Sequence, residues 1–195
     1  MLMDCGHGDV IEGIRRLAEN GQLEFTGTGK YHPILPLIPK EEVKSQIDLN
    51  TQTNRHFLGK VYTPQGFFPP EMYYSQDILQ PIINSGYRWI ILSGIACPSE
   101  WSMDTIYRAK CDGQKIAVFF RDDVLSNRIS FQELGAKEFI AHLEEWQGER
   151  GNIYVVTAMD AETYGHHIQG WEKTFLARVY EKLGPAAESL EEVKQ

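Results

Sequence analysis

Three apolar runs constrain the fold of this chain more than any other feature of its sequence. Residues 88–92, 115–120 and 153–159 are continuous, mostly apolar stretches without polar alternation. This is the pattern of parallel strands that are buried on both faces. Segments with apolar residues at helical spacing lie between and after the runs. Strands and helices in alternation, joined by right-handed crossovers, predict an α/β fold with a parallel sheet or barrel.

Weaker signals extend this pattern along the chain. Short extended segments are expected at residues 22–26 and 66–71, the second because each proline disfavours the α region at the residue before it. Helices are expected over the remaining periodic stretches, which are residues 10–17, 41–57, 75–84, 131–146 and 168–183. We expect one domain over residues 1–187 and a charged tail over residues 188–195.

Charge and composition exclude several functions. The 195 residues include 19 basic and 27 acidic ones, which gives a net charge of −8. Binding to nucleic acid or to anionic membranes needs clustered Lys and Arg, so neither partner is expected. No apolar run approaches the length of a membrane span, and the N-terminus has no apolar signal sequence. Cys5, Cys97 and Cys111 match no disulfide or zinc pattern, so we expect reduced, partly buried thiols in a cytoplasmic protein.

Acidic residues recur at the ends of the predicted strands, where reactive groups lie in parallel α/β folds. Glu71 follows two prolines at the end of one extended segment, and Asp160 directly follows the last apolar run. Glycoside hydrolysis needs two facing carboxyl groups, one at the sugar C1 and one that donates a proton to the leaving oxygen. Glu71 and Asp160 meet this requirement. The alternative interpretation is structural: Glu71 is then a first-turn helix acid, and Asp160 and Glu162 cap the following helix.

Other polar residues lie near the same predicted strand ends. Glu24 is in the extended segment 22–26, His32 follows it, and Glu162 and His166 follow Asp160. Hydrogen bonding to sugar hydroxyls is the function that we favour for His32, His166 and Glu162. Histidine is also a common metal ligand, but adjacent residues such as His166 and His167 point in different directions. The sequence therefore assigns no metal ligand.

The order of three motifs resembles glycoside hydrolase family 57. Residues 21–24 followed by 31–37 resemble the second conserved region of that family. Residues 66–72 are similar to its third region, whose glutamate is the catalytic nucleophile. Residues 159–167 are similar to its fourth region, whose first aspartate is the general acid/base. The resemblance spans residues 7–180, and the ordered set is more specific than any single motif.

The resemblance implies an incomplete form of a seven-stranded β/α barrel and a retaining mechanism on α-linked glucans. Glu71 would attack C1 and form a glycosyl-enzyme intermediate, and Asp160 would act as the acid and then as the base. Glu24, His32, Glu162 and His166 would contact sugar hydroxyls. The substrate would be an α-glucan oligosaccharide or polysaccharide, and the chemistry would require no metal or cofactor.

The sequence departs from the family at its N-terminus. The family's first region is a His-Gln-Pro strand, and this tripeptide does not occur here. The chain therefore resembles a truncated member, whose open strand edges would allow self-association. Two alternatives stay open. One is a catalytically inactive fragment that binds carbohydrate or assembles with other chains, and the other is a metal-dependent carbohydrate deacetylase that uses Asp160 and histidines.

Overall fold

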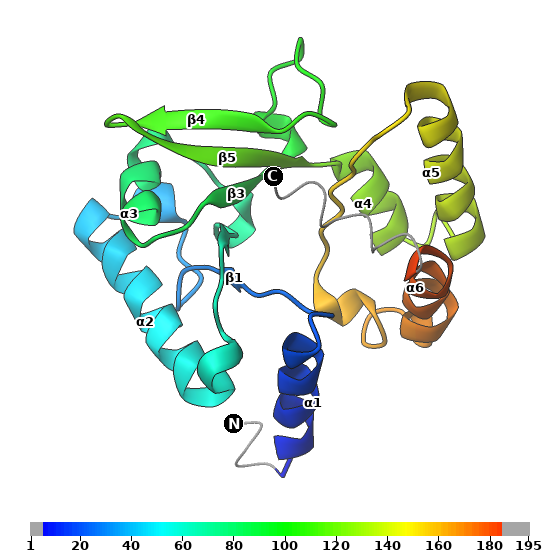
Figure 1. Cartoon of the computed structure of the whole chain (residues 1–195), viewed down its shortest axis with the longest axis horizontal. Coiled ribbons are helices and arrows are strands. Elements are labelled where there is room, and N and C mark those ends of the chain that lie inside the picture. The colour runs from blue at the N-terminus through cyan, green and yellow to red at the C-terminus, as the bar shows by residue number, and fades with distance from the viewer. Residues whose placement is uncertain (1–5, 185–195) are drawn as a thin grey trace. The chain divides into compact units, whose positions relative to one another are not determined.

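The structure, a computed structural model, describes residues 6–184. Cys5 and the predicted tail at residues 188–195 lie outside the described residues. The chain divides into two compact units, the first ending at Phe120 and the second beginning at Arg121. Figure 1 labels most of the helices and strands of the two units, which are described separately below.

The first unit contains the sheet. Within the described residues it has five strands in the order β1-β2-β3-β5-β4, with β1, β2 and β3 parallel. The strands are β1 (Thr26–Gly27), β2 (Gly66–Phe67), β3 (Trp89–Ser93), β4 (Tyr107–Cys111) and β5 (Gln114–Arg121). The predicted strands at residues 88–92 and 115–120 are thus confirmed as β3 and β5. The segment predicted at residues 22–26 pairs only at its end, in β1.

Strand β4 is an element that the apolar runs do not reveal. It pairs antiparallel with β5 through a turn at Asp112 and Gly113, whose φ angles are 48° and 79°. Asp-Gly with two positive φ angles is the preferred two-residue hairpin turn, because its twist matches that of the flanking strands. Burial alternates along β4, so this strand has a period-2 pattern. The predicted parallel arrangement is confirmed for β1, β2 and β3, and β4 adds an antiparallel strand at one edge of the sheet.

Each stretch with helical periodicity contains a helix, whereas one of the three apolar runs forms no strand. The first unit contains α1 (Gly8–Glu19), α2 (Lys40–Leu58) and α3 (Leu79–Asn84). The second contains α4 (Asp123–Ser130), α5 (Ala136–Arg150) and α6 (Ala177–Leu183), with a π-helical turn, Glu172–Leu176, before α6. The helix predicted at residues 131–146 is α5, which begins only at Ala136 because the chain first turns at Gln132 with φ 58°. Helix α4 was not predicted. None of the helices within residues 6–184 is long and apolar enough to cross a membrane.

Each unit has its own hydrophobic core. In the first, α2 and α3 lie side by side and pack apolar side chains against the strands, with Ile47, Phe67, Leu79, Ile82 and Ile90 almost fully buried. In the second, buried residues of α4 and α5 pack against the C-terminal helical segment, residues 171–183. The principal residues of this core are Leu125, Ile129, Phe139, Trp171 and Phe175.

Two glycines let aromatic rings lie directly on the sheet. A Cβ atom at Gly27 would lie 2.0 Å from Oη of Tyr87, and one at Gly66 would lie 2.1 Å from Cζ2 of Trp89. Gly66 of β2 is paired with Trp89 of β3. The absence of side chains at both positions brings the aromatic residues close to the strands that lead to the candidate site.

The run at residues 153–159 is not a strand in the structure. It is an irregular segment in the second unit, although Asp122 N at the start of α4 donates a hydrogen bond to Val156 O at 2.8 Å. Its apolar composition reflects partial burial, since Val155 and Met159 pack against the core of the second unit. The prediction of a third buried strand here was therefore wrong.

Candidate active site

Glu71 lies on a strained turn directly after β2. Pro69 and Pro70 are buried and fix the direction in which the chain leaves the strand. Glu71 and Met72 then adopt left-handed backbone conformations, with φ angles of 55° and 54°. Residues other than glycine seldom adopt this region, and such strain gathers at functional sites. The turn leaves the Glu71 side chain 62% exposed.

His32 is the side chain that the structure brings to Glu71. Nε2 of His32 lies 2.8 Å from Oε1 of Glu71, so the ring N–H can donate to the carboxylate. His32 follows β1, the parallel neighbour of β2, and its φ angle is also positive, at 55°. Phe68 N donates to Gly27 O at 2.8 Å and continues the pairing of β1 and β2 toward the site. Two residues 39 apart in the sequence therefore meet at the carboxyl ends of adjacent strands.

Glu24 does not join this pair. It is exposed and lies before β1, not at its carboxyl end. Among the described side chains it makes no hydrogen bond with His32 or Glu71. The structure thus brings together two of the three predicted site residues of the first unit.

Asp160 begins a tight loop in the second unit. It is exposed and is followed by a 3-10 turn, Ala161–Thr163, in which Thr163 is buried. The carbonyl of Glu162 accepts hydrogen bonds from His166 N at 3.1 Å and His167 N at 2.8 Å. The loop therefore presents exposed polar side chains on a backbone fixed by its own hydrogen bonds.

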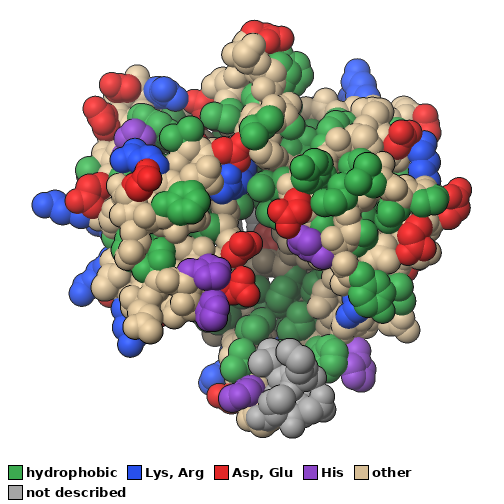
Figure 2. Space-filling view, turned by 180° about the vertical axis from the view of Figure 1, so that it is seen from behind, with side chains coloured by type: hydrophobic (Ala, Val, Ile, Leu, Met, Phe, Trp, Pro, Cys, Tyr) green, Lys and Arg blue, Asp and Glu red, His purple; other side chains and the backbone are tan. Residues whose placement is uncertain are grey.

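Glu162 pairs with His167 in this loop, and His166 lies beside them. Oε2 of Glu162 is 3.9 Å from Nε2 of His167, and the His166 and His167 rings are 5.1 Å apart at an angle of 58°. Figure 2 shows histidine side chains directly beside acidic ones on the surface. Across residues 6–184, no group of three or more His, Cys, Asp or Glu side chains has the arrangement needed to hold a metal ion.

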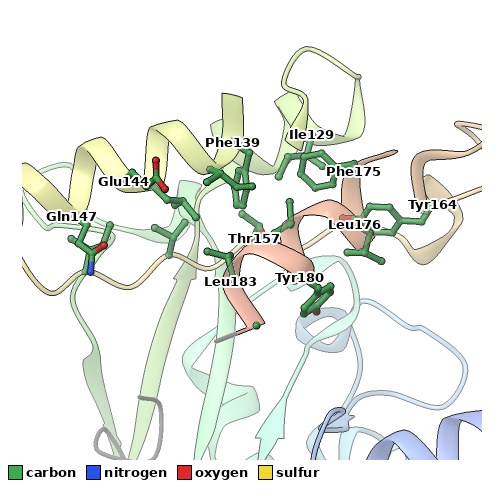
Figure 3. A pocket seen from close by; sticks show the side chains of 16 residues that line it. Ile129, Phe139, Glu144, Gln147, Thr157, Tyr164, Phe175, Leu176, Tyr180 and Leu183 are labelled. Atoms are coloured by element: carbon green, nitrogen blue, oxygen red, sulfur yellow. The ribbon is translucent and has the colours of Figure 1, made fainter. Parts of the chain in front are cut away.

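A pocket of about 520 Å³ lies elsewhere in the second unit, between α5 and the C-terminal helical segment. Figure 3 shows mostly apolar side chains around it, among them Phe139, Phe175 and Leu183. Asp160, Glu162 and His166 do not line this pocket. Since none of the predicted site residues lines it, we do not assign this pocket to the candidate active site.

Comparison with known proteins identifies the family. The model of glycosyl hydrolase family 57 matches residues 3–193. The chain belongs to glycosyl hydrolase family 57. The resemblance of the ordered motifs is confirmed by this match.

Relatives of this family 57 chain are considerably longer. It is 26% identical over 196 residues to alpha-amylase 1 of Dictyoglomus thermophilum, covering 94% of this chain and 28% of that protein. It is 28% identical over 178 residues to the 4-alpha-glucanotransferase of Thermococcus litoralis, covering 89% of this chain and 26% of that protein. The chain thus spans little more than a quarter of the length of these curated relatives.

Solved structures confirm the fold class. The crystal structure of 4-alpha-glucanotransferase from Thermococcus litoralis aligns with a TM-score of 0.75 at 24% identity, over 90% of this chain and 28% of that one. The alpha-amylase AmyC of Thermotoga maritima aligns with a TM-score of 0.73 at 17% identity, over 94% and 50%. The α/β fold with a mostly parallel sheet, related to part of the family's barrel, is the fold predicted from the sequence.

Sequence reasoning gave no role to Arg121, which the structure of this family 57 chain places against the segment that carries Asp160. Its guanidinium Nε donates to the carbonyl of Ala158 at 2.7 Å, two residues before Asp160. The signal available in the sequence was its position at the end of an apolar run, next to Asp122 and Asp123. An arginine at such a place can bind backbone carbonyls as readily as substrate, so its role depends on the tertiary structure.

Proposed function

We propose that this chain carries the two catalytic carboxyl groups of a retaining enzyme that acts on α-linked glucans. Glu71 is the nucleophile and Asp160 is the general acid/base. Family membership supports the reaction class. The observation that carries the proposal is the environment of Glu71, whose exposed carboxylate stands on a left-handed turn and is hydrogen-bonded by His32.

The hydrogen bond from His32 suits a nucleophile. It engages Oε1 of Glu71 and leaves Oε2 available for attack on the sugar C1. It also restricts rotation of the carboxylate, which lowers the entropic cost of reaching the attack geometry. His32 is then a positioning residue for Glu71, in addition to or in place of the predicted contact with a sugar hydroxyl.

The reaction proceeds in two displacements. In the first, Glu71 Oε2 forms a bond to C1 while the bond from C1 to the leaving oxygen breaks, and Asp160 gives its proton to that oxygen. In the second, Asp160 takes a proton from water or from an acceptor sugar hydroxyl, whose oxygen attacks C1 and releases Glu71. Water as the acceptor gives hydrolysis, and a sugar hydroxyl gives transfer.

The other predicted site residues bind sugar hydroxyls in this proposal. Glu162 and His166 are exposed next to Asp160 and can exchange hydrogen bonds with sugar hydroxyls. Glu24 is assigned a more remote sugar contact, since it lies at the opposite end of β1 from His32. The substrate class is an α-linked glucan oligosaccharide or polysaccharide.

The test compares carboxylate-to-amide variants on maltooligosaccharides. Glu71→Gln and Asp160→Asn should each reduce turnover by at least about 100-fold, because general acid/base and nucleophilic groups contribute effects of this size. Asp112→Asn is the matched control for Asp160→Asn, since Asp112 is exposed in the β4–β5 turn. Glu145→Gln on the exposed face of α5 is the control for Glu71→Gln. Both controls should retain the turnover of the unaltered chain.

The products distinguish hydrolysis from transfer. Oligosaccharides longer than the donor indicate transfer, and shorter ones alone indicate hydrolysis. Glucan binding without turnover in the unaltered chain would refute catalysis and favour a carbohydrate-binding function. Unchanged turnover in either amide variant would refute the assignment of that residue.

A further inference from the structure

The segment that carries Asp160 lacks the support of a strand. Residues 153–159 make no strand pairing, although an acid/base must be held in a reproducible place. The groups that hold this segment are therefore of functional interest. They come from the end of β5 and the first turns of α4, all within the second unit.

Arg121 binds the segment from one side. Its Nε donates to Ala158 O at 2.7 Å, and one terminal nitrogen donates to Asn127 Oδ1 at 3.0 Å. The other terminal nitrogen forms an ion pair with Asp123. The Arg121 side chain is only 11% exposed. Its planar guanidinium is thus engaged on three sides and fixed in orientation.

Ser126 binds the same residue through its other backbone group. Ala158 N donates to Ser126 Oγ at 3.2 Å, and Ser126 is completely buried. Both backbone polar groups of Ala158 are therefore satisfied by side chains instead of a neighbouring strand. Asp122 N adds a third bond, to Val156 O at 2.8 Å.

This arrangement replaces a strand ladder just before the candidate acid/base. Ala158 is separated from Asp160 by one residue, Met159. Two residues of chain span at most about 7 Å, so a displacement of Ala158 also displaces Asp160. Misplacement of a catalytic group by about 1 Å can lower the rate about 100-fold.

We propose that Arg121 and Ser126 are positioning residues for Asp160, acting through the backbone of Ala158. This inference rests on the proposed role of Asp160 as the general acid/base. Neither side chain is required to touch the substrate. Their function is to hold an irregular segment in one place without pairing it to a strand.

The first measurement is independent of catalysis. Backbone amide hydrogen exchange is followed over residues 157–163 in the full 195-residue chain, in the unaltered protein and in Arg121→Gln. The exchange should become at least about 10-fold faster in this segment, because opening is no longer opposed by the guanidinium. Arg178→Gln is the control, since Arg178 is exposed and, within residues 6–184, forms its ion pair with nearby Glu181 on α6. Unchanged exchange in Arg121→Gln would overturn the inference.

The second measurement separates positioning of the acid from general damage. On maltooligosaccharides, Arg121→Gln should lower kcat about 10- to 100-fold and change KM less than about 3-fold. On α-maltosyl fluoride with added azide, the loss should shrink to less than about 3-fold. Fluoride departs without needing full protonation, and azide attacks C1 without a base, so neither displacement depends on a well-placed Asp160. The same deficit on both substrates would contradict a positioning role.

Conservative variants complete the test. Ser126→Thr keeps the hydroxyl and should keep more of the kcat than Ser126→Ala; equal loss in both would argue against the bond to Ala158. If Asp160→Asn abolishes turnover but Arg121→Gln leaves kcat unchanged, the inference is overturned and the proposed function stands. If the unaltered chain shows no turnover, the proposed function and the kinetic part of the inference are both overturned, while hydrogen exchange still decides whether Arg121 holds the segment.

Discussion

Replacement of Gly66 by alanine should destabilise the sheet beside the candidate nucleophile. Three indole atoms of Trp89 would lie 2.1–2.2 Å from the new Cβ, whereas real Cβ contacts essentially never fall below 3.0 Å. Carbon atoms pack best at about 3.5–4.0 Å, so the ring or the strand must move by roughly 1.5 Å. The φ angle of Gly66 lies outside the left-handed region, so the clash with Trp89 is the main cost of the substitution.

The size of the effect follows from how firmly Trp89 is held. Its ring packs against Phe119, with centroids 5.7 Å apart at an angle of 73°, so displacement of the indole disturbs a second aromatic ring. Overpacking of this kind costs about 1–3 kcal/mol. For a protein of this length, that corresponds to a fall in Tm of about 2–12 °C.

Urea unfolding followed by circular dichroism measures this cost. Gly148→Ala is the matched control: it lies within α5, and beyond the neighbouring backbone of that helix nothing is within 4 Å of its added Cβ. It should stabilise the helix by about 0.5–1 kcal/mol. If Gly66→Ala were neutral or stabilising, as Gly148→Ala should be, the steric argument would be refuted. In a double-mutant cycle, Trp89→Ala should remove most of the cost of Gly66→Ala.

Three further predictions concern titration, capping and metal dependence. Burial raises the pKa of Tyr62 and Tyr87 above their ordinary value of 10.0. The folded state therefore holds these protons more tightly, and the free energy of unfolding should fall as pH rises above 10; a flat urea midpoint between pH 9 and 11 would refute this. Asp122→Ala should cost about 1 kcal/mol, because Asp122 Oδ1 accepts from Leu125 N at 2.8 Å and caps α4. Asp48→Ala, which removes an exposed ion pair, should cost less than about 0.5 kcal/mol in the same urea assay. Turnover of α-glucan should survive prolonged dialysis against a chelator, whereas a metal-dependent deacetylase would lose activity.

The sequence predicted most of the elements that have a continuous local signal. The helices other than α4, and strands β3 and β5, are examples, because helical periodicity and buried apolar runs are properties of neighbouring residues. Strand β4 was missed because its side chains alternate in burial and its run is short. The Asp112-Gly113 pair is the hairpin signal that the sequence holds at this position, since Asp-Gly favours two successive positive φ angles.

The irregular segment shows why apolar composition alone cannot establish a strand. Residues 153–159 are as apolar as β5, since part of their surface packs against the core of the second unit. A strand also needs a partner whose backbone groups are free to pair. Here Arg121 and Ser126 satisfy the backbone of Ala158, and that arrangement depends on the fold of α4.

By itself, the sequence determined the fold class, the family and the residues on which the catalytic proposal rests. Ordered motifs carry this information because they fix residue types along the chain. Only the tertiary structure decided that His32 meets Glu71 and that both have left-handed backbones. Only the tertiary structure also decided that side chains hold the segment before Asp160. Such contacts join residues that are distant in sequence, and local propensity carries no information about which of them will meet.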